Sequence, residues 1–87
     1  MSRPQEASAA LCEALREILR EARIEADLSL NELGKRSGVD RNAISFVEQG
    51  RRIPSVETLA KIAFGLGLPA SLLWQRAERR DLGNKGK

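Results

Sequence analysis

The chain has 87 residues, of which 41% are hydrophobic and 31% are charged, and its formal net charge at pH 7 is +3. This balance is typical of one small globular domain and argues against a disordered chain. No apolar run approaches the roughly 20 residues of a membrane span or the pattern of a secretion signal. We therefore expect a cytoplasmic protein with no membrane partner. The single cysteine cannot form an internal disulfide, which suits a reducing compartment.

Composition also bears on catalysis and on the kind of partner. The chain has no histidine and no tyrosine, no Cys/His set with metal-ligand spacing and no glycine-rich phosphate loop. We therefore expect no enzyme activity, no cofactor and no metal. The charge is uneven: residues 1–28 hold four basic and six acidic residues, residues 29–61 hold six and four, and residues 62–87 hold five and two. This distribution indicates attraction to an anionic partner from one side only.

The first predicted element is an amphipathic helix over residues 8–26. Its apolar residues recur at helical spacing and form one stripe: Leu11, Leu15, Ile18, Leu19 and Ala22. Cys12 lies at the edge of this stripe and is interpreted as a small apolar filler. Residues 1–7, which include Pro4, are expected to be disordered.

Residues 30–49 have the pattern of two short helices joined by a tight turn. Ser29 and Glu32 form a capping box that starts the first helix. Gly34 in the middle of that helix indicates close approach of a second helix, because glycine there costs roughly 1 kcal/mol relative to alanine. Gly38 ends the first helix in a left-handed conformation, and Asp40 caps the second, which begins at Arg41.

The second helix of this pair has two distinct faces. Its inward face, toward Leu33, consists of Ala43, Ile44 and Val47, and its outward face consists of Arg41, Asn42, Ser45, Phe46 and Gln49. The outward set is hard to explain by stability, since Arg41 stands at the positive end of the helix dipole and Phe46 leaves a ring in water. We therefore expect this face to meet something outside the domain.

Two further helices complete the expected order. Gly50 ends the preceding helix, Pro54 stiffens the loop that contains Arg51 and Arg52, and Ser55 caps the next helix. That helix has an inward stripe of Val56, Leu59, Ile62, Ala63 and Leu66, and Gly67 stops it. A last helix runs from about residue 69 or 70 to residue 80, and residues 81–87 are a flexible tail. The sequence thus predicts an all-α fold of five helices in a single domain over residues 8–80.

The last helix also suggests how two copies associate. Ala70, Leu73, Trp74 and Ala77 have the spacing of a face against the core, which leaves Leu72 in solvent. Together with the large Trp74 at the edge of a small core, this favours a two-fold homodimer with Leu72, Leu73 and Trp74 at its interface. The early start of the first helix either projects beyond the core or adds dimer surface.

These motifs together resemble the helix-turn-helix of the Cro and phage-repressor (lambda repressor-like) family over roughly residues 15–77. The matching residues are Leu19, Arg20, Arg23, Leu28, Ser29, Glu32, Leu33, Gly34, Ser37, Gly38, Val39, Ile44, Ser45, Glu48, Gly50, Pro54, Ser55, Leu59, Ala63, Leu66 and Gly67. The resemblance implies DNA binding, with base contacts from Arg41, Asn42, Ser45 and Phe46 and phosphate contacts from Arg51 and Arg52. It also implies a partly buried ion pair between Arg23 and Glu48. The chain departs from the family pattern at Leu30, often a phosphate-binding glutamine, and at Asp27, often glycine.

Each proposed contact has an alternative. Arg41 either binds the O6 and N7 acceptors of guanine or is a solvated arginine, and Asn42 either pairs with adenine or is a polar residue of the first helical turn. Ser45 binds a base or a phosphate. Phe46 touches a thymine methyl or folds back onto the protein. Gln49 and the amides at the Ser55 helix start are further candidate phosphate donors.

The sequence therefore predicts a sequence-specific transcriptional regulator that binds double-stranded DNA as a homodimer. Its recognition helix, residues 41–49, enters the major groove of a palindromic operator. The size resembles stand-alone Cro-type regulators and the controller proteins of restriction-modification systems. The alternative is a protein-binding module, such as an antitoxin that covers a toxin and autoregulates its operon.

Overall fold

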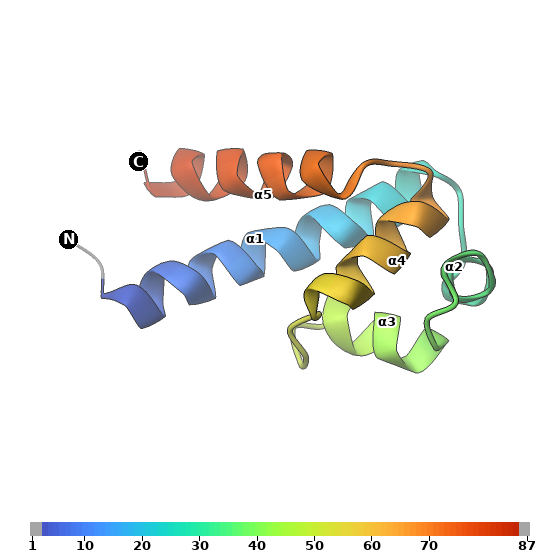
Figure 1. The fold of residues 1–87 in the computed structure, drawn as a ribbon. Helices are drawn as coiled ribbons and strands as arrows, with labels where there is room; N and C mark the ends of the chain where they lie inside the picture. The colour runs from blue at the N-terminus through green and yellow to red at the C-terminus, as the bar shows by residue number, and fades with distance from the viewer. Residues whose placement is uncertain (1–2, 86–87) are drawn as a thin grey trace.

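The computed structural model describes residues 3–85 and arranges them as five helices, with no strand in this part of the chain (Figure 1). They are α1 (Pro4–Glu25), α2 (Leu30–Ser37), α3 (Arg41–Glu48), α4 (Val56–Leu66) and α5 (Ala70–Lys85). The predicted all-α fold of five helices is confirmed. Within the described residues no single helix is long and apolar enough to cross a membrane, and α4 and α5 reach that length only as a pair bent by 104°.

The helices form a compact body with one long projecting pair. Helices α1 and α5 lie side by side and run in opposite directions, while α2, α3 and α4 gather at the end where α1 finishes and α5 begins (Figure 1). Helix α4 packs against α2, and α3 packs against both α1 and α2. The core takes residues from every helix, and its most deeply buried large side chains are Leu33, Ile44, Val47, Ile62 and Leu73.

Helix α1 begins earlier than the sequence pattern predicted. It starts at Pro4, so the expected disorder of residues 1–7 is wrong for residues 4–7, and residues 1 and 2 lie outside the described part. Proline is favoured in the first helical turn, because its missing N–H has no intrahelical partner there and its fixed φ suits the helix. Reading Pro4 as a sign of disorder therefore placed the boundary one turn too late.

Helix α5 ends later than predicted. It continues to Lys85 instead of stopping near Arg80, so residues 81–85 are helical, and residues 86 and 87 of the expected tail lie outside the described part. Gly83 and Asn84 have low helix propensity, which suggested an end. Propensity is overridden here by packing, since α5 lies along α1 and Asp81 is buried.

The inward stripe of α4 is shorter than expected. Leu59 is half-buried against the core and Ile62, Ala63 and Leu66 are buried, but Val56 is 87% exposed, so its assignment to the core was wrong. Val56 is the first residue of α4 and follows the loop directly, one turn before the buried part of the helix begins. Phe64, to which the sequence pattern gave no role, is 80% exposed on the same helix.

The exposures along α5 also differ from the expectation. Leu73 and Ala77 are fully buried as predicted. The sequence pattern placed Leu72 in solvent and Trp74 against the core, whereas in the structure Leu72 is half-buried and Trp74 is 39% exposed. The helical period predicts correctly that Leu73 and Ala77 lie on the buried side of α5. It does not give the exposures on either side, which depend on how α5 meets α1 and α4.

Candidate nucleic-acid interface

The turn between α2 and α3 is built as its sequence predicts. The Ser29 hydroxyl accepts from the Glu32 N–H and the Glu32 carboxylate accepts from the Ser29 N–H, which completes the capping box. Gly38 ends α2 with φ +74°. A Cβ on Gly34 would lie 3.0 Å from the Val39 carbonyl oxygen, so this glycine permits the close approach of the two helices. The Asp40 carboxylate then accepts from the Asn42 N–H and caps α3.

The two faces of α3 are separated as expected. Ile44 and Val47 are buried in the core, whereas Arg41, Asn42 and Phe46 face solvent. Arg41 is not free of the protein, because its Nη1 donates to Asn31 Oδ1 on α2 over 3.2 Å. This contact is exposed, and water or an acceptor on a ligand can replace it at little cost. The first turn of α3 therefore presents one guanidinium and one amide to the outside.

Ser45 and Gln49 form a linked pair on the side of α3 that faces α1. Ser45 is half-buried, and Gln49 Nε2 donates to its hydroxyl oxygen over 2.8 Å. The Gln49 amide and the Ser45 hydroxyl would therefore meet a ligand as one hydrogen-bonded pair and not as two separate groups. Of the four predicted base readers, Ser45 is the least exposed.

Phe46 lies close to both arginines of the following loop. The Arg51 guanidinium carbon is 5.6 Å from the centre of the Phe46 ring and that of Arg52 is 5.8 Å from it, both within cation–π range. The ring remains 36% exposed. It is therefore placed beside the loop cations while part of it still faces solvent.

Ser55 caps α4, and its hydroxyl is already engaged. It accepts from the Thr58 N–H over 3.0 Å and donates to the Thr58 hydroxyl over 3.0 Å. A phosphate at this end of α4 would meet backbone N–H groups of the first turn more readily than the Ser55 side chain.

Two arginines of α1 hold the far end of α3. Arg23 and Glu48 form a two-pronged ion pair, with Nε–Oε2 of 2.7 Å and Nη2–Oε1 of 2.9 Å, and Arg23 Nη1 donates to the Leu28 carbonyl oxygen. The hydrogen bond with Glu48 raises the pKa of Arg23 above its ordinary value. Arg16 Nη1 donates to the Glu48 carbonyl oxygen over 3.0 Å. These contacts fix α3 relative to α1.

The sequence pattern missed the basic side of α1. Arg16, Arg20 and Arg23 lie at i, i+4 and i+7 and line a shallow hollow that also includes Leu30, Ser45, Glu48 and Gln49. Arg20 is exposed there and no role was predicted for it. The net charge of residues 1–28 is negative, so a count of charges over this region did not indicate a basic side. The helical spacing of the three arginines would have indicated it.

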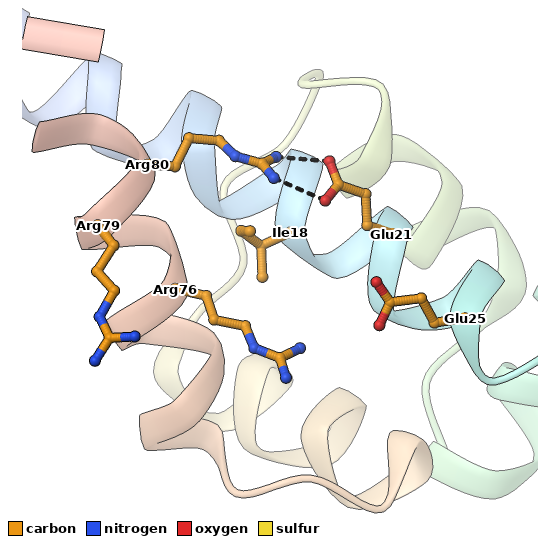
Figure 2. A pocket seen from close by; sticks show the side chains of 6 residues that line it. All are labelled: Ile18, Glu21, Glu25, Arg76, Arg79 and Arg80. Carbon is orange, nitrogen blue, oxygen red and sulfur yellow. Dashed lines mark hydrogen bonds and ion pairs between the residues drawn. The ribbon is translucent and has the colours of Figure 1, made fainter. Parts of the chain in front are cut away.

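The acidic side of α1 faces α5 instead. Arg80 binds both carboxylate oxygens of Glu21 over 2.6 and 2.7 Å (Figure 2). The Glu17 carboxylate lies 3.5 Å from the same guanidinium. Figure 2 shows the hollow between α1 and α5, which is lined by Ile18, Glu21, Glu25, Arg76, Arg79 and Arg80. Residues 1–28 are acidic on balance, yet Arg16, Arg20 and Arg23 of α1 border α3, whereas Glu17 and Glu21 face α5.

Comparison with known proteins agrees with this geometry. The chain belongs to the helix-turn-helix family, whose family model matches residues 19–73. This is the Cro/C1 type of helix-turn-helix, a class of DNA-binding transcriptional regulators and not an enzyme class. The predicted resemblance is thereby confirmed.

Two curated relatives cover the central part of the chain. An uncharacterized HTH-type transcriptional regulator of Mycobacterium tuberculosis (strain H37Rv) is 41% identical over 59 residues, which are 68% of this chain and 42% of the relative. The ImmF control region 10 kDa protein of Bacillus phage phi105 is 34% identical over 56 residues, which are 64% of this chain and 62% of the relative. The chain thus spans less than half of the mycobacterial relative.

Two solved structures share the fold. The clp gene regulator ClgR from Corynebacterium glutamicum matches with a TM-score of 0.79 and 30% identity, over 87% of this chain and 81% of that chain. The wild-type restriction-modification controller protein C.Esp1396I matches with a TM-score of 0.76 and 22% identity, over 83% of this chain and 95% of that chain. At this lower identity, the second match concerns the fold alone.

Proposed function

We propose that this protein is a sequence-specific transcriptional regulator that acts in the cytoplasm and binds double-stranded DNA as a homodimer on a palindromic operator. Helix α3 enters the major groove, and each protomer reads one half-site. The observation that carries the proposal is the exposed face of α3, which begins with Arg41 and Asn42 and continues through Phe46 to Arg51 and Arg52. One surface thus holds polar groups suited to base edges and cations suited to phosphates.

In this proposal the first turn of α3 reads bases and its surroundings bind the backbone. Arg41 leaves Asn31 to bind guanine O6 and N7, Asn42 pairs with adenine, and the Phe46 edge touches a thymine methyl. Ser45 contributes through the hydroxyl it shares with Gln49. The phosphate contacts come from four positions beside α3, which are Gln49, Arg51, Arg52 and the start of α4 at Ser55.

The exposed Arg20 adds a cation on the α1 side of this surface. Leu30 has no polar group for the phosphate contact that its family position often makes, and both Leu30 and Arg20 line the hollow beside Gln49. Arg20 is therefore well placed to supply the missing contact. The surface then offers phosphate-binding cations on both sides of α3, which favours one binding orientation on the duplex.

The proposed homodimer needs an interface away from α3. On α5, one of the three predicted interface residues is not accessible. Leu73 is fully buried within the protomer, so it cannot belong to an interface, and Leu72 is half-buried. Of the three predicted interface residues, only Leu72 and Trp74 remain accessible, and Trp74 is 39% exposed.

The decisive experiment is selection of bound fragments from random DNA, followed by affinity measurements on the selected operator. Arg41→Ala should relax preference at one base pair per half-site and cost about 1 to 3 kcal/mol of binding free energy. Arg52→Ala should weaken every sequence alike and lower the slope of log affinity against log salt by about one. Arg79→Ala, an exposed arginine on α5, is the matched control and should change neither. Equal loss on every DNA for both Arg41→Ala and Arg52→Ala would contradict the assignment.

The antitoxin alternative gains no specific support from the described residues. A module that only covers a toxin or another protein would leave the polar first turn of α3 and the cations beside it without a role. Random DNA that yields no enriched sequence would favour that alternative. An adjacent toxin gene would then identify the partner, whereas an adjacent endonuclease gene would indicate a controller protein.

A further inference from the structure

Helix α4 carries a second apolar face that the core does not use. Its inward face is formed by Leu59, Ile62, Ala63 and Leu66, whereas Val56, Ala60 and Phe64 follow one another at i, i+4 and i+8 along the outside. We call these three residues the α4 stripe. Val56 is 87% exposed and Phe64 is 80% exposed, the two highest values among the exposed large hydrophobic residues of the described chain.

One further exposed apolar residue precedes the helix. Ile53, in the loop that leads into α4, is 71% exposed, so three large apolar side chains lie in water within twelve residues of sequence. Single exposed apolar residues are ordinary, but an aligned set with polar neighbours marks an interaction surface. Glu57 and Lys61 border the stripe and bind each other over 3.1 Å.

We propose that the α4 stripe is the surface through which two copies of this chain pair, α4 against α4, in opposite directions about a two-fold axis. An axis that passes by Ala60 sets Val56 of each copy opposite Phe64 of the other. The small Ala60 side chains meet at the centre and let the helices approach closely. The order large, small, large is thus its own complement under a two-fold rotation.

The charged border fits the same arrangement. In an antiparallel pair, Glu57 of one copy lies beside Lys61 of the second copy, and the reverse contact forms at the other end. The bridge that now joins Glu57 and Lys61 within one helix is exposed, so exchanging it for two bridges between copies costs little. A partner of unrelated sequence would not need this symmetry, which is why a second copy is the favoured occupant.

This inference rests on the proposed homodimer and moves its interface from α5 to α4. The basic loop with Arg51 and Arg52 directly precedes α4, so antiparallel pairing through α4 sets the two loops at opposite ends of the helix pair, one on each side of the axis. One helix face buries less than the standard interface of about 800 Å² per partner. The free dimer is therefore weak, and a shared operator strengthens it.

Sedimentation velocity of the full chain over a range of concentrations tests the interface. Phe64→Glu buries a carboxylate in the pair and should weaken dimerisation at least about tenfold. Trp74→Glu is the matched change on α5 and should leave the dimer intact. Circular dichroism of each variant checks that its helices are retained. A dimer unchanged by Phe64→Glu and lost in Trp74→Glu would overturn the inference in favour of α5, and loss in both variants would keep α4 in an interface that extends to α5.

Charge exchange gives a test that does not depend on apolar burial. Glu57→Lys alone should weaken the dimer, since the introduced ammonium would then face Lys61 of the second copy. Combining it with Lys61→Glu should restore the dimer, because opposite charges again face each other. Failure of the double variant to restore what the single variant loses would count against the antiparallel pairing.

Binding to the selected operator separates this inference from the proposed function. Phe64→Glu should lose affinity for the full palindrome and keep wild-type affinity for a duplex that contains one half-site. Equal affinity of variant and wild type for both duplexes would overturn the α4 pairing but leave DNA binding intact. Wild-type protein that remains a monomer at every concentration and on the palindrome would overturn the homodimer together with its α4 interface.

Discussion

At the residue scale, Arg16 joins α1 to the end of α3. Its guanidinium donates to the Glu48 carbonyl oxygen at the end of α3 and is paired with Glu13 on its own helix. It also fills the space beside Gly50, where an added Cβ would lie 2.9 Å from Arg16 Nε. A residue of α1 thus binds the carbonyl end of α3, at the point where the basic loop begins.

Replacing Arg16 tests this contact. Arg16→Ala removes a charged donor from a part-buried carbonyl and should lower the free energy of unfolding by clearly more than the control Arg79→Ala, an arginine of equal size. Arg16→Lys should recover part of the loss, because an ammonium can still reach a single acceptor. Urea denaturation followed by circular dichroism measures all three variants. Equal stability of Arg16→Ala and the control would exclude the role.

Asp27 has a left-handed backbone conformation that glycine adopts more easily. It lies at φ +58° where α1 ends, its N–H donates to the Ile24 carbonyl and the Leu28 N–H donates to the Arg23 carbonyl, a Schellman-type end. The left-handed conformation costs a residue with a Cβ roughly 1 to 2 kcal/mol, and aspartate tolerates it better than most. Asp27→Gly should therefore raise the free energy of unfolding by about 0.5 to 1 kcal/mol. Asp27→Ala should give no gain in the same urea titration, and a gain equal to that of glycine would contradict this account.

Residue type and helical period predicted which side chains of α3 face outward, because the buried alternative needs apolar groups at fixed spacing. They did not predict where those side chains rest. The contact of Arg41 with Asn31 joins two helices, and the stacking of Arg51 and Arg52 on Phe46 depends on the course of a loop. Such positions are set by three-dimensional neighbours that a linear pattern does not contain.

At the scale of the elements, α2 and α4 meet through a glycine. A Cβ on Gly65 would lie 2.9 Å from Leu33 Cδ1 and from Ser37 Cβ, and 3.0 Å from the Ser37 backbone nitrogen. The backbone atom cannot move aside as a flexible side chain can. Since α2 leads into the turn to α3, this close contact also affects the position of α3.

Two glycine substitutions with opposite expected effects on stability test the close contact between α2 and α4. Gly65→Ala should overpack the α2–α4 contact and lower the free energy of unfolding by about 1 to 3 kcal/mol. Gly83→Ala, on an exposed part of α5 with no atom within 4 Å of the added Cβ, should raise it by about 0.5 to 1 kcal/mol. Thermal unfolding of the two variants beside the wild type compares them directly. A Gly65→Ala protein as stable as the wild type would show that α2 and α4 can separate freely.

The elements were predictable where local chemistry marks their ends. Ser29, Gly38, Asp40 and Gly67 act at the boundaries that the sequence pattern gave them. The outer ends of α1 and α5 were not predicted. Pro4 stands in the first turn of α1, where proline is favoured, and α5 continues past the buried Asp81 despite the low helix propensity of Gly83. The outward α4 stripe was missed for a related reason, since one helical period cannot describe a helix with two apolar faces.

At the scale of the whole molecule, three exposed glutamates make the stability of the fold depend on pH. A side-chain hydrogen bond with Arg80 lowers the pKa of Glu21, and one with Arg16 lowers the pKa of Glu13. The Ser29 N–H lowers the pKa of Glu32 in the capping box. Each carboxylate is thus held in its charged form more strongly in the folded chain than in the unfolded one.

The sign of the pH dependence follows from these lowered values. Stability from such groups is fully present above the ordinary glutamate pKa of 4.5 and is lost as pH falls through the lower folded-state pKa. The melting temperature should therefore fall between about pH 5 and about pH 2. Glu21→Gln and Glu32→Gln should each lower the melting temperature near neutral pH and flatten that fall, whereas Glu78→Gln, an exposed glutamate on α5, should do neither. A profile that stays equally steep in both test variants would mean that the acid sensitivity arises from other groups.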